Sequence, residues 1–282
     1  MTKILAALSA LAMIASAHAQ GEQGPHKLTK LWETDASLKV PESVRFDARR
    51  KVLYVSNIDG EPWAADGKGS IAKVGLDGKV IAAEWITGLD APKGLAQSDD
   101  GRFLYVPDAG GVWVIDIDAG KVREKIAIPD GVQLNDIVND GGTLYVSDSK
   151  GRKVWVVKDG KPSVHLDEKV LKGPNGLYVH KGALYVLDDN ALSRVEKDKT
   201  LTVLAKDMPG GVDGLENVAG DDFLVSAWGG AIWYVPANGE KQLVFDGKPD
   251  AIRTADIGWD PATRTVYAPT FFRNTVIAFK VE

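Results

Sequence analysis

The chain has 282 residues, a formal net charge of −5 and no cysteine. A mildly acidic chain without a basic cluster is not expected to bind nucleic acid. The lack of cysteine excludes disulfides, thiolate nucleophiles and Cys-based metal sites.

The first 19 residues have the pattern of a secretory signal peptide. Lys3 is followed by the apolar run ILAALSALAMIASA and then by Ala17-His18-Ala19. This matches a basic start, a short apolar core and a small-residue cleavage site. We therefore expect cleavage after Ala19, leaving a periplasmic or secreted protein of residues 20–282. The apolar run is short for a membrane span, so no membrane association is expected after cleavage.

A short apolar motif recurs along the rest of the chain. It reads LYVSN at 53–57, LYVPD at 104–108, LYVSD at 144–148 and LYVLD at 184–188, with weaker copies FLVSA at 223–227 and VYAPT at 266–270. Each copy is flanked by other strand-like runs and by turns rich in Gly and Asp, and long amphipathic helical patterns are absent. Six units of about 40 residues and about four strands predict an all-β, six-bladed β-propeller with four-stranded blades. We expect residues 20–282 to form this single domain.

The two ends of the mature chain are expected to meet. The segment KLTKLWET, residues 27–34, is one extra strand-like piece before the first repeat. The last repeat ends with TVIAFKVE, residues 275–282, and so lacks the fourth strand of its blade. The N-terminal strand therefore is predicted to complete the last blade and close the ring.

The opening strand of each blade carries one residue two positions before a Val, Leu or Ile, and this residue is polar in five of the six blades. Equivalent positions in a propeller converge on the axis, and here they are Glu42, Lys93, Asn135, Asn175, Asp213 and, in the sixth repeat, Ala255. Four of these supply carboxylate or amide oxygens, which suit a hard cation such as Ca²⁺ or Mg²⁺. The alternative is that the Asn-Gly and Asp-Gly pairs form turns around a hydrated channel. The pattern favours a metal site formed by Glu42, Asn135, Asn175 and Asp213.

The chain resembles the SMP-30/gluconolactonase/LRE-like six-bladed propellers, relatives of diisopropyl fluorophosphatase and the paraoxonases. The resemblance rests on PESVRFD around Glu42, LNDIVNDGGTLYVSD around Asn135, GPNGLYVHKGALYVLD around Asn175 and GVDGLENVAGDDFLVS around Asp213. It implies one divalent cation, usually Ca²⁺, with Mg²⁺, Mn²⁺ or Zn²⁺ as alternatives, held by these four residues. Gluconolactonase-like members often carry an Arg two residues before the blade-three Asn. Here Gln133 takes that place, which argues against a gluconolactone-type substrate for this chain.

The resemblance implies hydrolysis of a small lactone, ester or phosphoester. The cation would polarise the carbonyl or phosphoryl oxygen, and Asp213 or Glu42 would act as general base, or Asp213 as nucleophile toward phosphorus. Lys93 could pair with a carboxylate, lie deeper or bind a substrate oxyanion. Residues expected to contact the small-molecule substrate are Lys93, Gln133, Trp63, Trp228, Phe271 and Arg273.

A different class of function remains open. Propellers are also common binding scaffolds, and a fold does not fix a function. The chain could be a non-catalytic propeller of the NHL type that binds a ligand or a protein. Lys93 and the missing Arg favour that alternative, whereas the four oxygen ligands favour the hydrolase.

Overall fold

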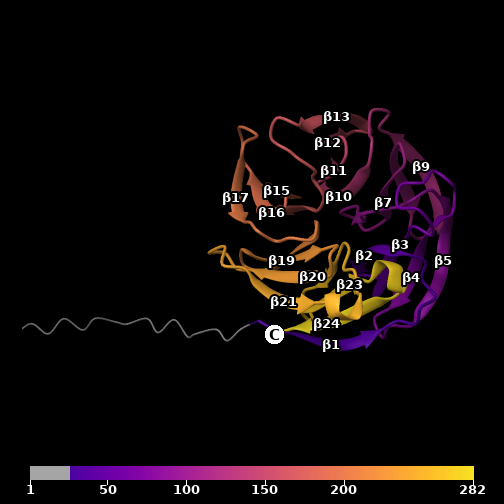
Figure 1. The fold of residues 1–282 in the computed structure, drawn as a ribbon. Coiled ribbons are helices and arrows are strands. Elements are labelled where there is room, and N and C mark those ends of the chain that lie inside the picture. Colours follow the sequence, from indigo (N-terminus) through magenta and orange to yellow (C-terminus); the bar gives the residue numbers. More distant parts are fainter. Residues whose placement is uncertain (1–25) are drawn as a thin grey trace, which may run out of the picture.

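The computed structural model describes residues 26–282, which form six four-stranded antiparallel sheets around a central axis (Figure 1). The predicted signal peptide lies outside the described residues. Blade one contains β2 (Pro41–Asp47), β3 (Val52–Asn57), β4 (Gly69–Gly75) and β5 (Val80–Leu89); blade two contains β6 (Ala96–Gln97), β7 (Phe103–Asp108), β8 (Gly111–Asp116) and β9 (Lys121–Ala127). Blade three contains β10 (Leu134–Asp140), β11 (Thr143–Asp148), β12 (Lys153–Lys158) and β13 (Lys161–Leu166).

The remaining blades follow the same order from the inner to the outer strand. Blade four contains β14 (Leu177–His180), β15 (Ala183–Asp188), β16 (Ala191–Val195) and β17 (Leu201–Ala205). Blade five contains β18 (Val212–Ala219), β19 (Asp222–Ala227), β20 (Ala231–Val235) and β21 (Gln242–Asp246). Blade six contains β22 (Gly258–Asp260), β23 (Thr265–Pro269), β24 (Val276–Val281) and β1 (Leu28–Glu33). Two short 3₁₀ turns, η1 (Lys248–Asp250) and η2 (Phe271–Arg273), lie in connecting segments. The six-bladed architecture is confirmed.

The N-terminal strand closes the ring as expected. β1 pairs antiparallel with β24, so that Leu28 lies opposite Val281, and Figure 1 shows the two strands side by side. Just beyond this pair, Lys27 and Glu282 exchange backbone hydrogen bonds of 3.1 and 2.9 Å. The outer strand of blade six therefore comes from the opposite end of the chain from its other three strands.

The repeated LYV motif occupies the second strand of each blade and is apolar on both faces because both faces are buried. In blade one, Leu53 packs toward blade six beside Tyr267, whereas Tyr54 packs toward blade two beside Leu104. Successive side chains on a strand point to opposite faces, so adjacent residues serve different inter-blade cores. Burial of these apolar surfaces holds neighbouring blades together and explains why the motif does not alternate with polar residues.

Aspartates at the ends of the second strands hold the loops that lead into their blades. Asp108 accepts hydrogen bonds from the backbone N–H groups of Asp90 and Ala91, both at 2.8 Å. Asp148 accepts in the same way from Val132 and Gln133. The repeated aspartate at the end of the second strand thus caps the loop that enters its own blade. The loops so fixed carry the first residues of the inner strands.

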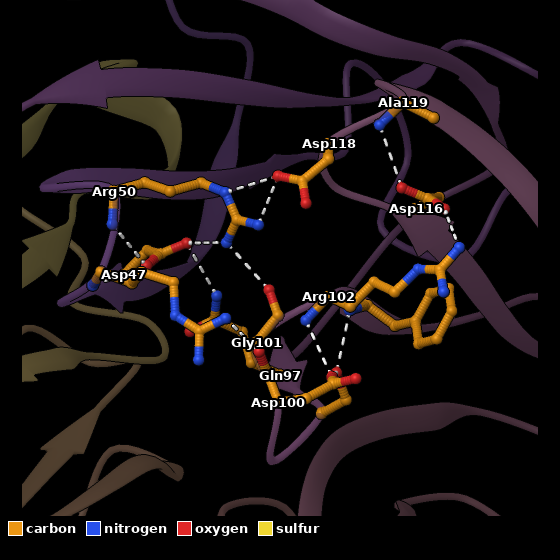
Figure 2. Close-up of polar contacts among 12 residues, drawn as sticks. Asp47, Arg50, Gln97, Asp100, Gly101, Arg102, Asp116, Asp118 and Ala119 are labelled. Carbon is orange, nitrogen blue, oxygen red and sulfur yellow. Dashed lines mark hydrogen bonds and ion pairs between the residues drawn. The ribbon is translucent and has the colours of Figure 1, made fainter.

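Arg50 links blade one to blade two at the rim (Figure 2). Its guanidinium bonds the carboxylate of Asp47 at 2.9 Å, the carbonyl oxygen of Gly101 at 2.8 Å and the carboxylate of Asp118 at 2.5 Å. Burial alone would raise the pKa of Asp47, but the backbone N–H and guanidinium of Arg50 and the amide of Gln97 hold it below its usual value. Asp47 is thus kept ionised as part of an inter-blade bridge.

Candidate functional site

The inner strands of the blades present equivalent backbone positions to the axis. Three backbone N–H groups donate to a carbonyl oxygen at or next to the end of the second strand of their own blade, β7, β15 or β23. They belong to Lys93 at 3.1 Å, Asn175 at 2.9 Å and Ala255 at 3.2 Å. The same bond in blades two, four and six confirms the position assigned to Ala255. Between blades six and one, the N–H of Asp256 donates to the carbonyl of Glu42 at 2.9 Å. This direct pairing holds the inner strands close together around the axis.

All four predicted metal ligands line one cavity of about 280 Å³. Lys93 lies in the same wall. The other residues around the cavity are Ile58, Pro62, Trp63, Gly211, Trp228 and Phe271. The polar side chains come from five different blades, which explains why they are far apart in the sequence. The structure therefore brings together the residues that the repeat alignment selected.

The two asparagines are oriented by hydrogen bonds that use their NH₂ groups. The Nδ2 of Asn175 donates to Oδ1 of Asp213 at 3.2 Å. The Nδ2 of Asn135 donates to Oγ of Ser149 at 3.1 Å, and that hydroxyl donates to the carbonyl of Pro174 at 2.7 Å. Because an amide has its donors on one end and its acceptor on the other, each Oδ1 is left as the free end.

A buried oxygen of Glu42 also lacks a partner. Among residues 26–282, no hydrogen-bond donor reaches Oε2 of Glu42, although the atom is buried. Such an acceptor costs free energy unless something else satisfies it. Together with the amide oxygens, it forms a set of oxygen donors into one cavity that fits a hard divalent cation. Asn175, which lies just before β14, thus orients Asp213 and also presents an oxygen to the cavity.

The site contains more acidic than basic side chains. Burial raises the pKa of Glu42 well above its usual range; Lys93 lowers it, and Asp213 raises it further. Burial likewise raises the pKa of Asp213, and the carboxylates of Asp256 and Asp136 add to the effect. A bound divalent cation would stabilise both carboxylates in the ionised form.

Lys93 is bound mainly by backbone carbonyls at the edge of the cavity. Its Nζ donates to the carbonyl oxygens of Pro62 at 2.6 Å and Ala91 at 3.2 Å, and lies 4.5 Å from the centre of the Trp63 ring. Burial lowers the pKa of Lys93, and the charge of Glu42 opposes this. In the described chain Lys93 forms no ion pair with Glu42, so its main structural effect is to hold the 58–68 loop against the cavity.

The expected substrate-contact residues separate into two groups. Trp63, Trp228 and Phe271 line the cavity, and the rings of Trp228 and Phe271 meet edge to face with centroids 5.8 Å apart. Gln133 lies beside Trp63 but lines a separate pocket of about 40 Å³. Arg273 does not line the cavity; its Nε donates to Oε1 of Glu33 in β1 at 2.9 Å.

Two carboxylates one residue further along the inner strands were missed by the sequence analysis. Asp256 accepts a hydrogen bond from Oγ of Ser43 at 2.5 Å. Asp136 accepts from the backbone N–H groups of Leu177 at 2.6 Å and Ile137 at 2.7 Å. The LNDI and ADI motifs contained both residues. The remaining blades have Ser or Gly at this position, so the position shows no repeated polar pattern.

Two features are absent from the part of the chain that the structure describes. Residues 26–282 contain no group of three or more His, Cys, Asp or Glu side chains placed to hold a metal ion. The candidate site combines two carboxylates with two amides and so differs from such a group. Within residues 26–282, no helix has the length and hydrophobicity of a membrane span.

No protein-family model and no curated protein sequence matches the chain. Solved structures do share its fold. A gluconolactonase from Xanthomonas campestris is 17% identical with a TM-score of 0.67, covering 92% of this chain and 91% of its own. An inactive virginiamycin B lyase from Staphylococcus aureus, solved with quinupristin, is 15% identical with a TM-score of 0.63, covering 91% and 99%. An auxiliary nutrient binding protein from Bacteroides thetaiotaomicron is 11% identical with a TM-score of 0.68, covering 87% and 70%. At these identities the likeness supports the propeller fold.

Proposed function

We propose that this chain is an exported, divalent-cation-dependent hydrolase of a small lactone, ester or phosphoester. The observation that carries the proposal is the convergence of four oxygen-bearing side chains from separate blades on one cavity. The gluconolactonase among the structural neighbours supports a hydrolytic chemistry on this scaffold. The N-terminal sequence pattern supports export.

Glu42, Asn135, Asn175 and Asp213 would hold the cation, with Ca²⁺ as the expected ion. When bound, the ion supplies a Lewis acid that polarises a carbonyl or phosphoryl oxygen and lowers the pKa of water. The amide of Asn175 holds Asp213 in a fixed orientation, so that Asp213 can take a proton from water as general base or attack phosphorus. Glu42 is the second candidate for the general base.

The cavity wall favours an apolar or ring-shaped substrate. The rings of Trp228 and Phe271 pack edge to face, and the ring of Trp63 lies against Nζ of Lys93 in the cavity wall. These rings would exclude water from the reacting bond and strengthen the electrostatic interactions within the site. Lys93 acts on the substrate indirectly in this proposal, because it holds the loop that carries Trp63.

Calorimetric titration of Ca²⁺ into the chelator-treated protein, residues 20–282, tests the metal site. We expect one ion per chain for the wild type, loss of binding for Asn175→Ala, and unchanged binding for Asn238→Ala, an exposed asparagine in the β20–β21 turn. Calcium-dependent turnover of a panel of lactones, aryl esters and aryl phosphoesters then tests the reaction. Failure of the wild type to bind Ca²⁺, Mg²⁺, Mn²⁺ or Zn²⁺ would rule out the proposed site.

A non-catalytic binding propeller of the NHL type is the second candidate. It is favoured by the ammonium of Lys93, which is buried against the cavity that would hold the cation. Asp213→Asn separates the candidates. For the hydrolase we expect this variant to stay folded and lose turnover. For the binding propeller no substrate of the panel is turned over by either protein, with or without metal.

A further inference from the structure

A second pocket lies deeper along the same inner strands. Three residues beyond Glu42 and Asp213 in their strands stand Arg45 and Glu216. At about 3.3 Å per residue, this places them about 10 Å further along the axis. They line a pocket of about 170 Å³ that shares no lining residue with the candidate metal site within the described chain. The two pockets are therefore distinct.

Arg45 and Glu216 each have polar atoms without a hydrogen-bond partner among the described residues. Nε of Arg45 is buried and finds no hydrogen-bond acceptor among residues 26–282. Glu216 is 9% exposed, and burial raises its pKa to about 8; Arg45 lowers it only in part, and no hydrogen bond contributes. Buried polar and charged groups normally have a hydrogen-bond partner. Nε of Arg45 and the carboxyl group of Glu216 are therefore free to bind a ligand in the pocket that both residues line.

The geometry of the ring explains why Arg45 and Glu216 do not pair directly. Arg45 belongs to blade one and Glu216 to blade five, and the equivalent residue of the intervening blade six is Gly258. A Cβ at Gly258 would lie 2.3 Å from the carbonyl oxygen of Val44, so a side chain is excluded there. Blade six therefore places no side chain at this position between the two residues, and no ion pair joins them within the described residues.

The other carboxylates of the pocket already accept hydrogen bonds. Asp136 receives two backbone N–H groups, and Asp256 receives the hydroxyl of Ser43. Among the described residues of this pocket, Glu216 is the carboxyl group to which no hydrogen bond contributes, and Arg45 is the guanidinium with an unpaired Nε. A ligand that carries a carboxylate for Arg45 and an ammonium for Glu216 would satisfy both. A simple anion would face three carboxyl groups, and a simple cation would leave Arg45 unpaired.

We propose that the pocket lined by Arg45, Glu216 and Tyr178 binds a small zwitterion, an amino acid of about the size of alanine or 4-aminobutyrate. A cavity near 150 Å³ accommodates a molecule of about the size of benzene, so the volume of about 170 Å³ suits this class. Tyr178 also lines the pocket, and burial together with the charge of Glu216 raises the pKa of its hydroxyl to about 12.

Calorimetry with defined probes tests this site. Alanine, β-alanine and 4-aminobutyrate are titrated at about pH 8.5, where Glu216 is mostly ionised, beside propionate and propylammonium, which carry only one of the two charges. We expect at least one amino acid to bind at a ratio of one per chain and about tenfold or more tighter than either single-charge probe, since a charged hydrogen bond contributes about that much. Arg45→Met and Glu216→Gln should each weaken its binding by about the same factor.

Asn175→Ala serves as the control, because it alters the candidate metal site and leaves the second pocket intact. It should lose Ca²⁺ and keep amino-acid binding, so that failure of one site is distinguishable from failure of the other. Absence of saturable binding of all three amino acids to the wild type up to about 10 mM would overturn the inference. So would propionate binding as tightly as the amino acids, which would indicate a plain anion site. Wild-type binding by Arg45→Met with an unchanged melting temperature would also overturn it.

Discussion

Replacing Glu216 with Gln should change how the stability of the protein depends on pH. Burial raises the pKa of Glu216 to about 8 in the folded chain, whereas the unfolded value is about 4.3. Between these values the folded state binds more protons than the unfolded state, so the free energy of unfolding falls as pH rises. Below about pH 4.3 the effect is absent, and above about pH 8 it is complete. Gln resembles the neutral carboxyl and does not ionise.

The size of the effect follows from the difference between the two pKa values. One pH unit corresponds to about 1.4 kcal/mol, so ionisation of Glu216 costs about 1 kcal/mol at pH 5 and about 5 kcal/mol at pH 8.5. The stability of Glu216→Gln relative to the wild type should therefore rise by about 4 kcal/mol between these two pH values. Other titrating groups contribute equally to both proteins and cancel in the difference.

Urea unfolding at half-unit pH steps from 5 to 8.5 measures this difference. Glu240→Gln is the matched control, since Glu240 is exposed in the β20–β21 turn, and its difference from the wild type should stay flat. A difference for Glu216→Gln that is constant or shrinks with rising pH would show that Glu216 ionises freely in the folded chain. In that case the charge would already have a partner, and the argument for an unpaired Glu216 would fail.

Three further changes test other parts of the structure. Lys93→Met removes a positive charge that acts on Glu42, so calorimetry should show Ca²⁺ bound about tenfold tighter; weaker binding would contradict the proposed charge balance. Gly94→Ala places a Cβ 2.2 Å from an aspartate oxygen of blade three and should lower stability by about 2–3 kcal/mol, whereas Gly173→Ala, which meets nothing closer than 3.7 Å, should not. Arg50→Met should cost about 2–3 kcal/mol at pH 7, and this deficit should shrink below about pH 4 as Asp47 loses its charge in both proteins.

The fold and the polar residues of the candidate metal site could be predicted because the repeated sequence unit occurs six times around the ring. The LYV motif marks equivalent strands, so residues at one offset from it must meet on the axis, as Asn135 and Asn175 do. Arg45 and Glu216 follow the same geometry. Their equivalents in other blades are Ala, Val, Tyr and Gly, so no repeated polar position drew attention to them.

Loop residues were harder to place for a different reason. Phe271 and Asn274 adopt positive φ angles of 53° and 60° on either side of Arg273. These left-handed residues reverse the direction of the chain, so Phe271 enters the cavity while Arg273 reaches Glu33 on the outer strand. The contact between Lys93 and the carbonyl of Pro62 likewise depends on the path of a loop that has no counterpart in the other repeats.

The pairing of β1 with β24 determines how the ring responds to mechanical force. The chain enters β1 at Leu28 and leaves β24 at Val281, and these two residues are opposite each other. Tension applied through both ends would therefore load the inter-strand hydrogen bonds one after another, as in opening a zipper, and not all together in shear. A tether attached at both ends should peel β1 from blade six at low force. If the force were applied between one end of the chain and an inner blade, the interface between two blades would instead have to break in a single step.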